Sequence, residues 1–333
     1  MAGQLRGTAF LSGEYVPLAD AKISVMTHAF NYGTGTFEGI RAYWNAAEEQ
    51  LFVFRLREHF ERLHNSCRVL AIELPYSVDE LGEMCLEVLR RSGFREDTYI
   101  RPIAYKSGLG IGVSMSGVPD DFLMYCQPMG NYIDVEQGIR CCVSSWRRNG
   151  DNAIPPRAKV TGAYINAALA KHEAVVNGYD EAIMLTETGR VSEGSAENLF
   201  VIKNRTLVTP SVSDSVLEGI TRATLIEIAR AELGVPTIER AVERTELYTA
   251  DEVFLCGTGA QVSPVVEIDH RRIGEGEIGP LTLALQQAYF DVVRGVNRAY
   301  APWLSPVYPG ATDEVEPERE PAFVANEGNV LAP

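Results

Sequence analysis

Three short segments carry residues whose chemistry could be combined in one site. Lys159 lies in the segment RAKVTGAYIN. This segment directly follows two prolines, and a predicted helix begins just after the lysine. Glu193 lies in SEGSAEN, a hairpin-like stretch between two predicted strands, and Gly219, Ile220 and Thr221 open another predicted helix. Taken singly, each has an ordinary explanation: a solvated lysine, an exposed turn carboxylate and a simple helix N-cap.

Together, the three segments supply what a pyridoxal phosphate site requires. A lysine amine can form a Schiff base with the cofactor aldehyde, and a carboxylate can keep the pyridine nitrogen protonated. The first amides of a helix have no partner within the helix and can bind a phosphate. We therefore expect Lys159, Glu193 and the helix start at 219–221 to meet around pyridoxal 5'-phosphate.

Other nucleotide, metal and nucleophile chemistries have little support in the sequence. Three glycine clusters, at 33–35, 108–113 and 257–259, lack both the dinucleotide-binding G-x-G-x-x-G context and the P-loop pattern. The five histidines form no H-E-x-x-H or comparable ligand set, so we expect no metal site. No G-x-S-x-G elbow occurs, which argues against an α/β-hydrolase.

Composition and charge restrict the partners and the compartment. The chain has 333 residues and a formal net charge of -15, a field that repels nucleic acid and anionic lipid. The sequence has neither a signal-peptide pattern nor a run of about 18 apolar residues, so we expect a cytoplasmic protein without a membrane partner. The six cysteines show no C-x-x-C spacing, and we predict no structural disulfide.

Hydrophobic periodicity predicts an α+β fold with two domains. Residues 1–126 are expected to form a small α+β domain, with helices over 57–70 and 78–92 and strands over 8–11, 22–25, 51–55 and 99–105. Because Pro102 cannot donate to a sheet, the last of these strands is expected at an edge.

A turn-rich interdomain loop is predicted at 127–138, followed by a large cofactor-binding domain over 139–299. Its strands are expected over 140–146, 181–186, 198–202, 207–209 and 252–256, and its helices over 161–177, 221–233 and 280–295. Residues 300–333 are rich in acid and proline, and we predict a flexible tail.

The chain resembles the class IV (fold type IV) aminotransferases, and within them the branched-chain amino acid aminotransferases. The resemblance covers about residues 9–295 and depends on a combination of motifs: HAFNYGTGTFEGIR, REHFERLH, YIRP, IPPRAKVTGAYIN, SEGSAENLF, LEGITR and DEVFLCGTGAQVSPV. It implies a two-domain fold type IV architecture, pyridoxal 5'-phosphate as cofactor and a homodimer or higher homo-oligomer. It also implies transamination of L-leucine, L-isoleucine and L-valine with 2-oxoglutarate, giving branched 2-oxo acids and L-glutamate.

Roles for individual residues follow from the resemblance. Lys159 corresponds to the Schiff-base lysine, which also moves the substrate α-proton, Glu193 to the partner of the pyridine nitrogen, and Tyr164 to the tyrosine that hydrogen-bonds the cofactor phenolate oxygen. The implied phosphate ligands are Arg62, Gly219, Ile220, Thr221 and Thr258. The implied substrate-binding residues are Tyr32, Phe37, Arg41, Tyr99, Arg101, Tyr132, Thr258 and Gly259.

Within the implied substrate pocket, three features decide which substrates fit. Arg101 would meet the distal carboxylate of glutamate, and the turn amides at Thr258 and Gly259 would receive the substrate α-carboxylate. Part of the segment 108–113 would come from a neighbouring subunit. Apolar walls with one arginine explain how one pocket takes both leucine and glutamate.

Some positions depart from the family pattern and leave alternatives open. Gly259 and Gln261 stand where alanine and glutamate are more usual, and Met129 stands where an aromatic residue is common. The alternatives are a D-amino acid or (R)-amine transaminase of the same fold and a non-catalytic protein that binds pyridoxal phosphate. The residues that favour the branched-chain interpretation are Phe37, Gly39, Arg41, Tyr99 and Arg101.

Overall fold

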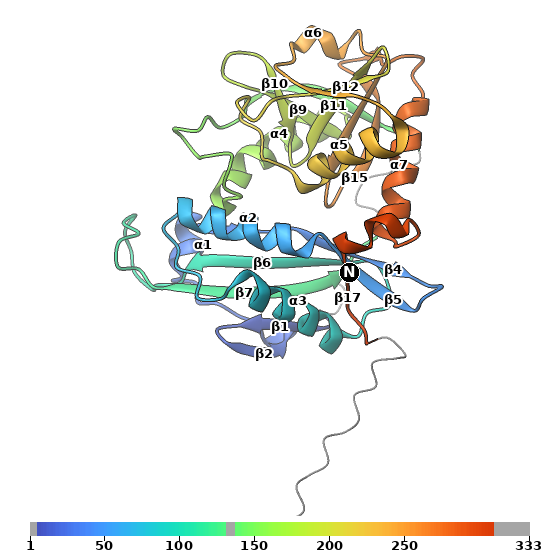
Figure 1. Ribbon diagram of the computed structural model, residues 1–333. Coiled ribbons are helices and arrows are strands. Elements are labelled where there is room, and N and C mark those ends of the chain that lie inside the picture. The colour runs from blue at the N-terminus through green and yellow to red at the C-terminus, as the bar shows by residue number, and fades with distance from the viewer. Residues whose placement is uncertain (1–4, 131–136, 310–333) are drawn as a thin grey trace, which may run out of the picture.

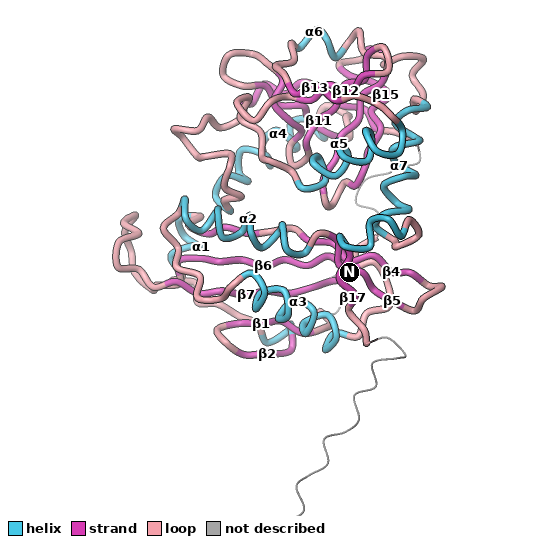
Figure 2. The backbone as a smooth tube through the Cα atoms, in the orientation of Figure 1, coloured by secondary structure: helices cyan, strands magenta, loops and turns pink. Residues whose placement is uncertain are grey.

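The computed structural model describes residues 5–130 and 137–309. Two β-sheets lie one above the other, with helices on their faces and between them (Figure 1). We call the first sheet and its helices the first half, and the second sheet and its helices the second half. Figure 2 shows long strands that run side by side in the first half, whereas the strands of the second half cross one another in the view because their sheet is twisted.

The first sheet has eight strands within the described residues, in the order β17-β5-β4-β6-β7-β1-β2, and β3 also pairs with β6. The strands are β1 (Thr8–Leu11), β2 (Glu14–Pro17), β3 (Gly35–Phe37), β4 (Ile40–Asn45), β5 (Gln50–Phe54), β6 (Thr98–Lys106), β7 (Asp120–Pro128) and β17 (Leu304–Pro306). The helices of this half are α1 (His28–Tyr32), α2 (Leu56–Val69) and α3 (Val78–Ser92), with a 3-10 turn at Leu18–Asp20.

The second sheet has nine strands within the described residues, in the order β10-β9-β8-β15-β14-β11-β12-β13, with β16 paired to β15. The strands are β8 (Ile139–Arg147), β9 (Glu181–Leu185), β10 (Val191–Gly194), β11 (Asn198–Lys203), β12 (Thr206–Thr209), β13 (Thr237–Glu239), β14 (Glu252–Gly257), β15 (Gln261–Ile268) and β16 (Arg271–Arg272). The helices are α4 (Tyr164–Val176), α5 (Ile220–Leu233), α6 (Arg244–Leu247) and α7 (Pro280–Val293), with 3-10 turns at Thr161–Ala163 and Arg298–Trp303.

Side-chain periodicity explains why these elements form where they do. On α2, Phe60, Leu63 and Cys67 recur at three- and four-residue steps and are buried against the first sheet. Ser77 and Glu80 form a capping box that starts α3. On β14 the apolar run is continuous because both faces are covered: Phe254 faces α5 and α7, while its neighbours face the opposite core.

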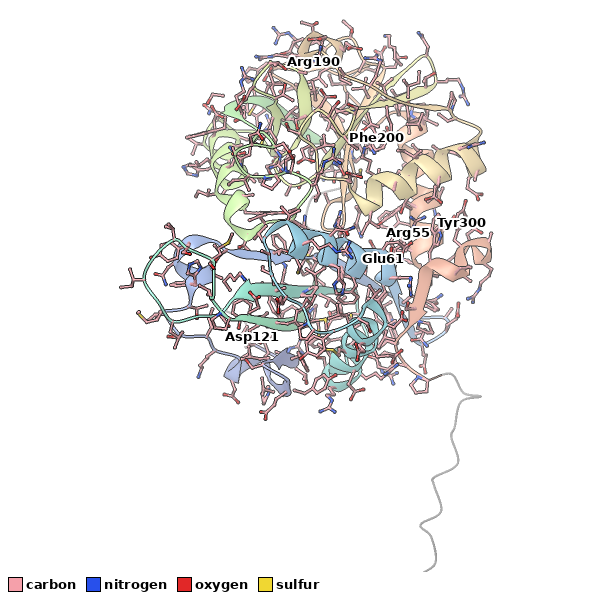
Figure 3. All side chains as sticks on the ribbon, turned by 60° about the vertical axis from the view of Figure 1, so that its left-hand side comes forward. Arg55, Glu61, Asp121, Arg190, Phe200 and Tyr300 are labelled. Carbon is pink, nitrogen blue, oxygen red and sulfur yellow. The ribbon has the colours of Figure 1, made fainter. Side chains whose placement is uncertain are left out.

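The two halves share a core on one side of the molecule. Tyr43 of β4 and Phe54 of β5 pack into the cluster formed by α5, α7, β14 and β15. The guanidinium of Arg55 lies 3.7 Å from the centre of the Trp303 ring and bonds Glu227 of α5 at 2.9 Å. Figure 3 shows Arg55 and Tyr300 together at this boundary. These contacts join the two halves on the side of α5 and α7.

Three expectations about the elements are corrected by the structure, and two of them concern strands of the first half. Residues 22–25 form no strand. The strand β6 lies inside its sheet and not at an edge. Its neighbour on one side is β7, and on the other side are two short strands, β3 and β4. Pro102 faces the gap between them, where its carbonyl accepts from the Glu38 amide at 3.0 Å and no donor is required of it.

The third correction concerns the beginning of the expected tail. Residues 300–309 do not open a flexible segment, because β17 pairs with β5 and closes the first sheet. The remaining tail, 310–333, lies outside the described residues. The division of the chain at 127–138 stays a prediction.

Candidate active site

A cavity of about 290 Å³ lies where the two halves face each other. Side chains from α2, β3, β6, β10, α4 and α5 and from the turn after β14 line it. The residues expected in one site and found together here are Phe37, Arg62, Tyr99, Arg101, Lys159, Tyr164, Glu193, Gly219, Ile220, Thr221, Thr258 and Gly259. Most of the residues expected in the site therefore lie around one cavity.

Lys159 is held by its backbone at the entrance to α4. Its amide donates to the Ser66 hydroxyl at 3.1 Å, and its carbonyl accepts from the Phe37 amide at 3.0 Å. The side-chain amine donates to the Tyr164 hydroxyl at 2.8 Å and lies 5.2 Å from the centre of the Phe37 ring. The amine is therefore directed into the cavity by fixed backbone on either side of it.

Glu193 is a buried carboxylate on β10 and not an exposed turn residue. It accepts from the Asn198 side-chain amide at 2.9 Å and from the Leu217 amide at 3.1 Å, and it pairs with Arg148 at 2.5 Å. Burial raises the pKa of Glu193, although Arg148 and the nearby Lys159 charge act in the opposite direction. A further cation placed against this carboxylate would be favoured.

The start of α5 presents free amides to the cavity. Gly219 is the N-cap and provides no side-chain cap, so the first amides of the helix are open to a ligand. A Cβ on Gly219 would lie 1.9 Å from the side-chain oxygen of Asn198, the residue that holds Glu193. Only glycine fits between the helix start and that asparagine.

Arg62 reaches the same end of the cavity from α2. Its guanidinium donates two hydrogen bonds of 2.7 Å to Glu38 and one of 2.8 Å to the carbonyl of Glu218. Glu38 is completely buried and also contacts His59 at 2.8 Å. Burial alone would raise the pKa of Glu38, but the Arg62 charge and the hydrogen bonds hold it at about 2. The orientation of Arg62 is therefore set by an ionised partner.

The opposite wall is formed by alternate residues of β6. Tyr99 and Arg101 point to the cavity, whereas Ile100 lies in the core of the first half. The Arg101 guanidinium donates to the Tyr99 hydroxyl at 2.6 Å and lies 4.3 Å from the centre of the Phe37 ring. A Cβ on Gly39 would lie 2.5 Å from that hydroxyl, so glycine is needed there.

Arg41, expected to contact substrate, is placed by the structure beneath the turn that follows β14. Its side chain is 1% exposed and donates to the carbonyls of Gly259 at 3.3 Å, Met129 at 3.0 Å and Gly130 at 2.9 Å. Arg41 is also 3.8 Å from Asp97. It supports the turn at 257–260 from behind.

Two further expected residues are not part of the described cavity wall. The Tyr32 side chain of α1 is exposed, and its hydroxyl accepts from the Gly112 amide at 2.9 Å. Tyr132 lies outside the described residues.

Several residues that organise the site had no prediction from the sequence. They are Glu38, His59, Arg148 and Asn198: Glu38, Arg148 and Asn198 each contact a cavity residue through a hydrogen bond or ion pair, and His59 contacts Glu38. The position of Glu38 in the motif TFEGIR was the one usable signal in the sequence. A glutamate buried among apolar residues requires a cationic partner. The partners themselves come from distant segments.

Neither a metal site nor a membrane span is found in what the structure describes. Over residues 5–130 and 137–309, no three His, Cys, Asp or Glu side chains are grouped in a way that could hold a metal ion. In the same part of the chain, none of the helices is long and apolar enough to cross a bilayer.

Comparison with known proteins gives a consistent result. The family model for amino-transferase class IV matches residues 35–268. A probable branched-chain-amino-acid aminotransferase of Aquifex aeolicus is 55% identical over 300 residues, which is 90% of this chain and 96% of that protein.

Solved structures of similar proteins have the same fold. The branched-chain aminotransferase of Thermoproteus uzoniensis with norvaline has a TM-score of 0.87 and 45% identity, with 91% of this chain and 99% of that chain covered. The branched-chain amino acid aminotransferase of Thermobaculum terrenum in its PLP form has a TM-score of 0.88 and 35% identity, with 92% of this chain and 100% of that chain covered. The branched-chain amino acid aminotransferase of Escherichia coli has a TM-score of 0.86 and 40% identity, with 91% and 100% covered.

Proposed function

The chain belongs to the class IV aminotransferases, and from that premise we propose that it is a branched-chain amino acid aminotransferase dependent on pyridoxal 5'-phosphate. One observation carries this proposal: the Lys159 amine, the buried Glu193 carboxylate and the open start of α5 surround a single cavity. The reaction exchanges the amino group of L-leucine, L-isoleucine or L-valine with 2-oxoglutarate.

The cavity residues fit the cofactor in both charge and position. We assign the phosphate to Arg62, Gly219, Ile220, Thr221 and Thr258, where open amides and a cationic side chain gather. The resulting phosphate site is built from both halves, since Arg62 belongs to α2 and the amides belong to α5.

The ring end of the site is assigned to Glu193 and Tyr164. When bound, pyridoxal phosphate supplies an electron-withdrawing ring that stabilises negative charge at the substrate α-carbon. Glu193 would keep the ring nitrogen protonated. Burial raises the pKa of this carboxylate, so a cation beside it would stabilise its ionised form. Tyr164 would hydrogen-bond the phenolate oxygen, and its hydroxyl accepts a hydrogen bond from the Lys159 amine.

Lys159 has two roles in this assignment. Its side-chain nitrogen would hold the cofactor through its aldehyde, and the free amine would accept the proton from the substrate α-carbon. The contact to the Tyr164 hydroxyl at 2.8 Å holds this nitrogen in the cavity. Positioned proton transfer of this kind contributes about 100- to 10,000-fold to rate.

The substrate side chain is assigned to the wall formed by Phe37, Tyr99 and Met129. An aliphatic chain removes apolar surface from water there, and Arg101 provides a cation for the distal carboxylate of glutamate. Arg101 is stacked on Phe37 and bonded to Tyr99, and these two contacts hold its guanidinium in the cavity wall. The turn at 258–259 is assigned to the substrate α-carboxylate.

The substrate class is tested by separate assays with L-leucine, D-alanine and (R)-1-phenylethylamine as amino donors to 2-oxo acids. We expect turnover with L-leucine. Turnover with only the other two donors would instead identify a D-amino acid or (R)-amine transaminase of the same fold. Lys159→Ala is expected to abolish turnover, whereas a protein that only binds the vitamin would show none before the substitution.

We propose further that the chain acts as a homodimer in the cytoplasm. The apolar side chains of Leu109, Ile111 and Val113 are 62%, 89% and 81% exposed on a loop next to α1, which is typical of a surface covered by another chain. The six buried, unpaired cysteines suit a reducing compartment. Sedimentation of the purified protein tests the assembly: a monomer at micromolar concentration would contradict it.

A further inference from the structure

One asparagine of the cavity wall makes hydrogen bonds toward both ends of the assigned cofactor site. Asn198 is 6% exposed and is the first residue of β11. Its side-chain nitrogen donates to the Glu193 carboxylate at 2.9 Å and to the Leu217 carbonyl at 2.9 Å. Because both partners are acceptors, the group that contacts them is the NH2 of the amide, and both of its protons are used.

The main chain of Leu217 closes these contacts into a ring. Its amide donates to the same oxygen of Glu193 at 3.1 Å, while its carbonyl accepts from Asn198. Three residues from separate segments are thus joined by three hydrogen bonds. Leaving a buried donor or acceptor without a partner is costly, so the ring favours one arrangement of its members.

The residues that follow Leu217 lead directly into the phosphate site. The Glu218 carbonyl accepts from Arg62 at 2.8 Å, and Gly219 is the N-cap of α5. Leu217 lies only two residues before Gly219, so a shift at Leu217 also moves the first amides of the helix. The ring therefore connects the carboxylate assigned to the pyridine nitrogen with the amides assigned to the phosphate.

The position of Asn198 is fixed by its own strand and by its neighbours. Its backbone pairs with Cys256 where β11 and β14 lie side by side inside the second sheet. The Gly194 amide donates to the Glu197 carbonyl at 2.6 Å and closes the tight turn before β11. A Cβ on Gly219 would lie 1.9 Å from the Asn198 side-chain oxygen, so the helix start is packed against this side chain. The amide of Asn198 is therefore a short link with little freedom to move.

We propose that Asn198 is a positioning residue that sets the distance between the Glu193 carboxylate and the phosphate-binding start of α5. The inference rests on the proposed function, because it takes these two groups as the ends of the cofactor site. Glu193 and Leu217 use both N–H groups of Asn198, so the residue acts through them. The affinity of a ligand that reaches both ends should depend on this distance, whereas that of a ligand at one end should not.

The test uses Asn198→Ala and Asn198→Val in the full chain as apoprotein, with three probes that lack an aldehyde. The probe 4-deoxypyridoxine 5'-phosphate reaches both ends, 4-deoxypyridoxine carries only the ring, and inorganic phosphate occupies only the phosphate site. Their Kd values are measured by calorimetry, with the two partial ligands in competition with the first probe, and Tm is recorded for each variant. None of the probes can react with Lys159, so the measurement is independent of turnover.

The matched control is Asn45→Ala, because Asn45 makes the same two kinds of bond away from the cavity lining. Its side-chain nitrogen donates to the Glu48 carboxylate at 2.9 Å and to the Arg294 carbonyl at 2.9 Å. Asn45 is the last residue of β4. We expect this substitution to change Tm alone.

We expect both Asn198 variants to raise the Kd of 4-deoxypyridoxine 5'-phosphate by about 20- to 100-fold, the effect of losing two hydrogen bonds of which one goes to a carboxylate. The Kd values of 4-deoxypyridoxine and of inorganic phosphate should each change by about twofold or less. The rise for the whole ligand thus exceeds the product of the rises for its two parts. Valine fills the space of the side chain without a donor, so agreement between the two variants assigns the effect to the lost hydrogen bonds.

Two results would overturn the proposal. One is a rise for the whole ligand that is no larger than the product of the rises for its two parts, including the case in which only Tm changes. The other is a rise in Asn198→Ala that is absent from Asn198→Val, which would assign the effect to lost volume. Failure of the proposed function has a different signature, because wild type itself would then show no turnover of L-leucine.

Discussion

Two buried glutamates, one in each half, each pair with an arginine that lines the cavity, and their pKa values shift in opposite directions. Glu38 of the first half pairs with Arg62, and its pKa falls to about 2. Glu193 of the second half pairs with Arg148, and its pKa is raised. Burial and an arginine are common to both, so neither feature alone explains the difference.

The difference lies in how completely each carboxylate is matched. Glu38 receives both arms of the Arg62 guanidinium and a ring nitrogen of His59. Glu193 receives one contact from Arg148, and its remaining partners are neutral amides. A two-armed pair outweighs the cost of burial, whereas a single contact does not. Glu38 is thus a fully paired carboxylate that anchors Arg62. Glu193 is incompletely paired and can accept one more cation.

The largest expected effect separates the two glutamates by turnover. Glu193→Gln removes the charge that holds a proton on the ring nitrogen, and we expect turnover to fall by at least about 100-fold. The unfolding free energy of the apoprotein should change by about 1 kcal/mol or less, because the amide keeps the neutral hydrogen bonds and the loss of the Arg148 pair is offset by removal of a buried charge whose raised pKa shows that burial outweighs its pairing. Steady-state rates and urea unfolding measure the two quantities. Turnover within tenfold of wild type would remove Glu193 from the mechanism.

Glu38→Gln should give the opposite pattern. Breaking the ion pair of the fully buried Glu38 leaves Arg62 without its charged partner, and we expect the unfolding free energy to fall by about 3 kcal/mol at neutral pH. Glu61→Gln is the matched control on α2, since this exposed carboxylate pairs with Arg57 on the surface and should cost about 0.5 kcal/mol or less. Equal losses in the two variants would show that Glu38 is not the anchor.

Acid unfolding sharpens the same comparison. Because the folded pKa of Glu38 is depressed to about 2 from an ordinary 4.5, its contribution is complete above the ordinary value and is lost as pH falls toward 2. The stability gap between wild type and Glu38→Gln should therefore shrink across this window. For Glu193 the sign is reversed, because a raised pKa penalises the ionised folded state, and wild-type apoprotein should gain on Glu193→Gln as pH falls. Urea unfolding at several acid pH values measures both, and two gaps of the same slope would contradict the contrast.

The smallest effect concerns His59. Its ring contacts Glu38 at 2.8 Å, and burial lowers its pKa, so the bond is that of a neutral imidazole. His59→Leu should cost about 1 kcal/mol, the usual worth of one hydrogen bond. Differential unfolding against Glu38→Gln measures it. A loss as large as that of Glu38→Gln would mean that histidine, and not Arg62, is the main partner.

Local patterns in the sequence predicted a large part of this fold. The helix α3 has the expected bounds, because a capping box at Ser77 starts it and Gly93 ends it. Lys159, Glu193 and the start of α5 could be selected from residue type and from their places between elements. These signals are contained within a few neighbouring residues, and a single sequence displays them directly.

Features that depend on distant partners could not be predicted. The interior position of β6 requires a neighbour divided at the Glu38 position, and nothing local to Pro102 shows this division. Arg148 and Asn198 act on Glu193 from other segments, and Arg41 lies beneath a turn that is distant in the chain. The strand β17 was missed because three residues give no periodicity.

The most direct test of the central claim is the site at which the cofactor is bound. Purified protein loaded with pyridoxal phosphate is reduced with borohydride, digested and mapped by mass spectrometry. The geometry around Lys159 predicts a pyridoxyl group on the peptide that contains this residue, and its loss in Lys159→Ala. A pyridoxyl group on a different lysine, or none on any peptide, would contradict the assignment of the cavity.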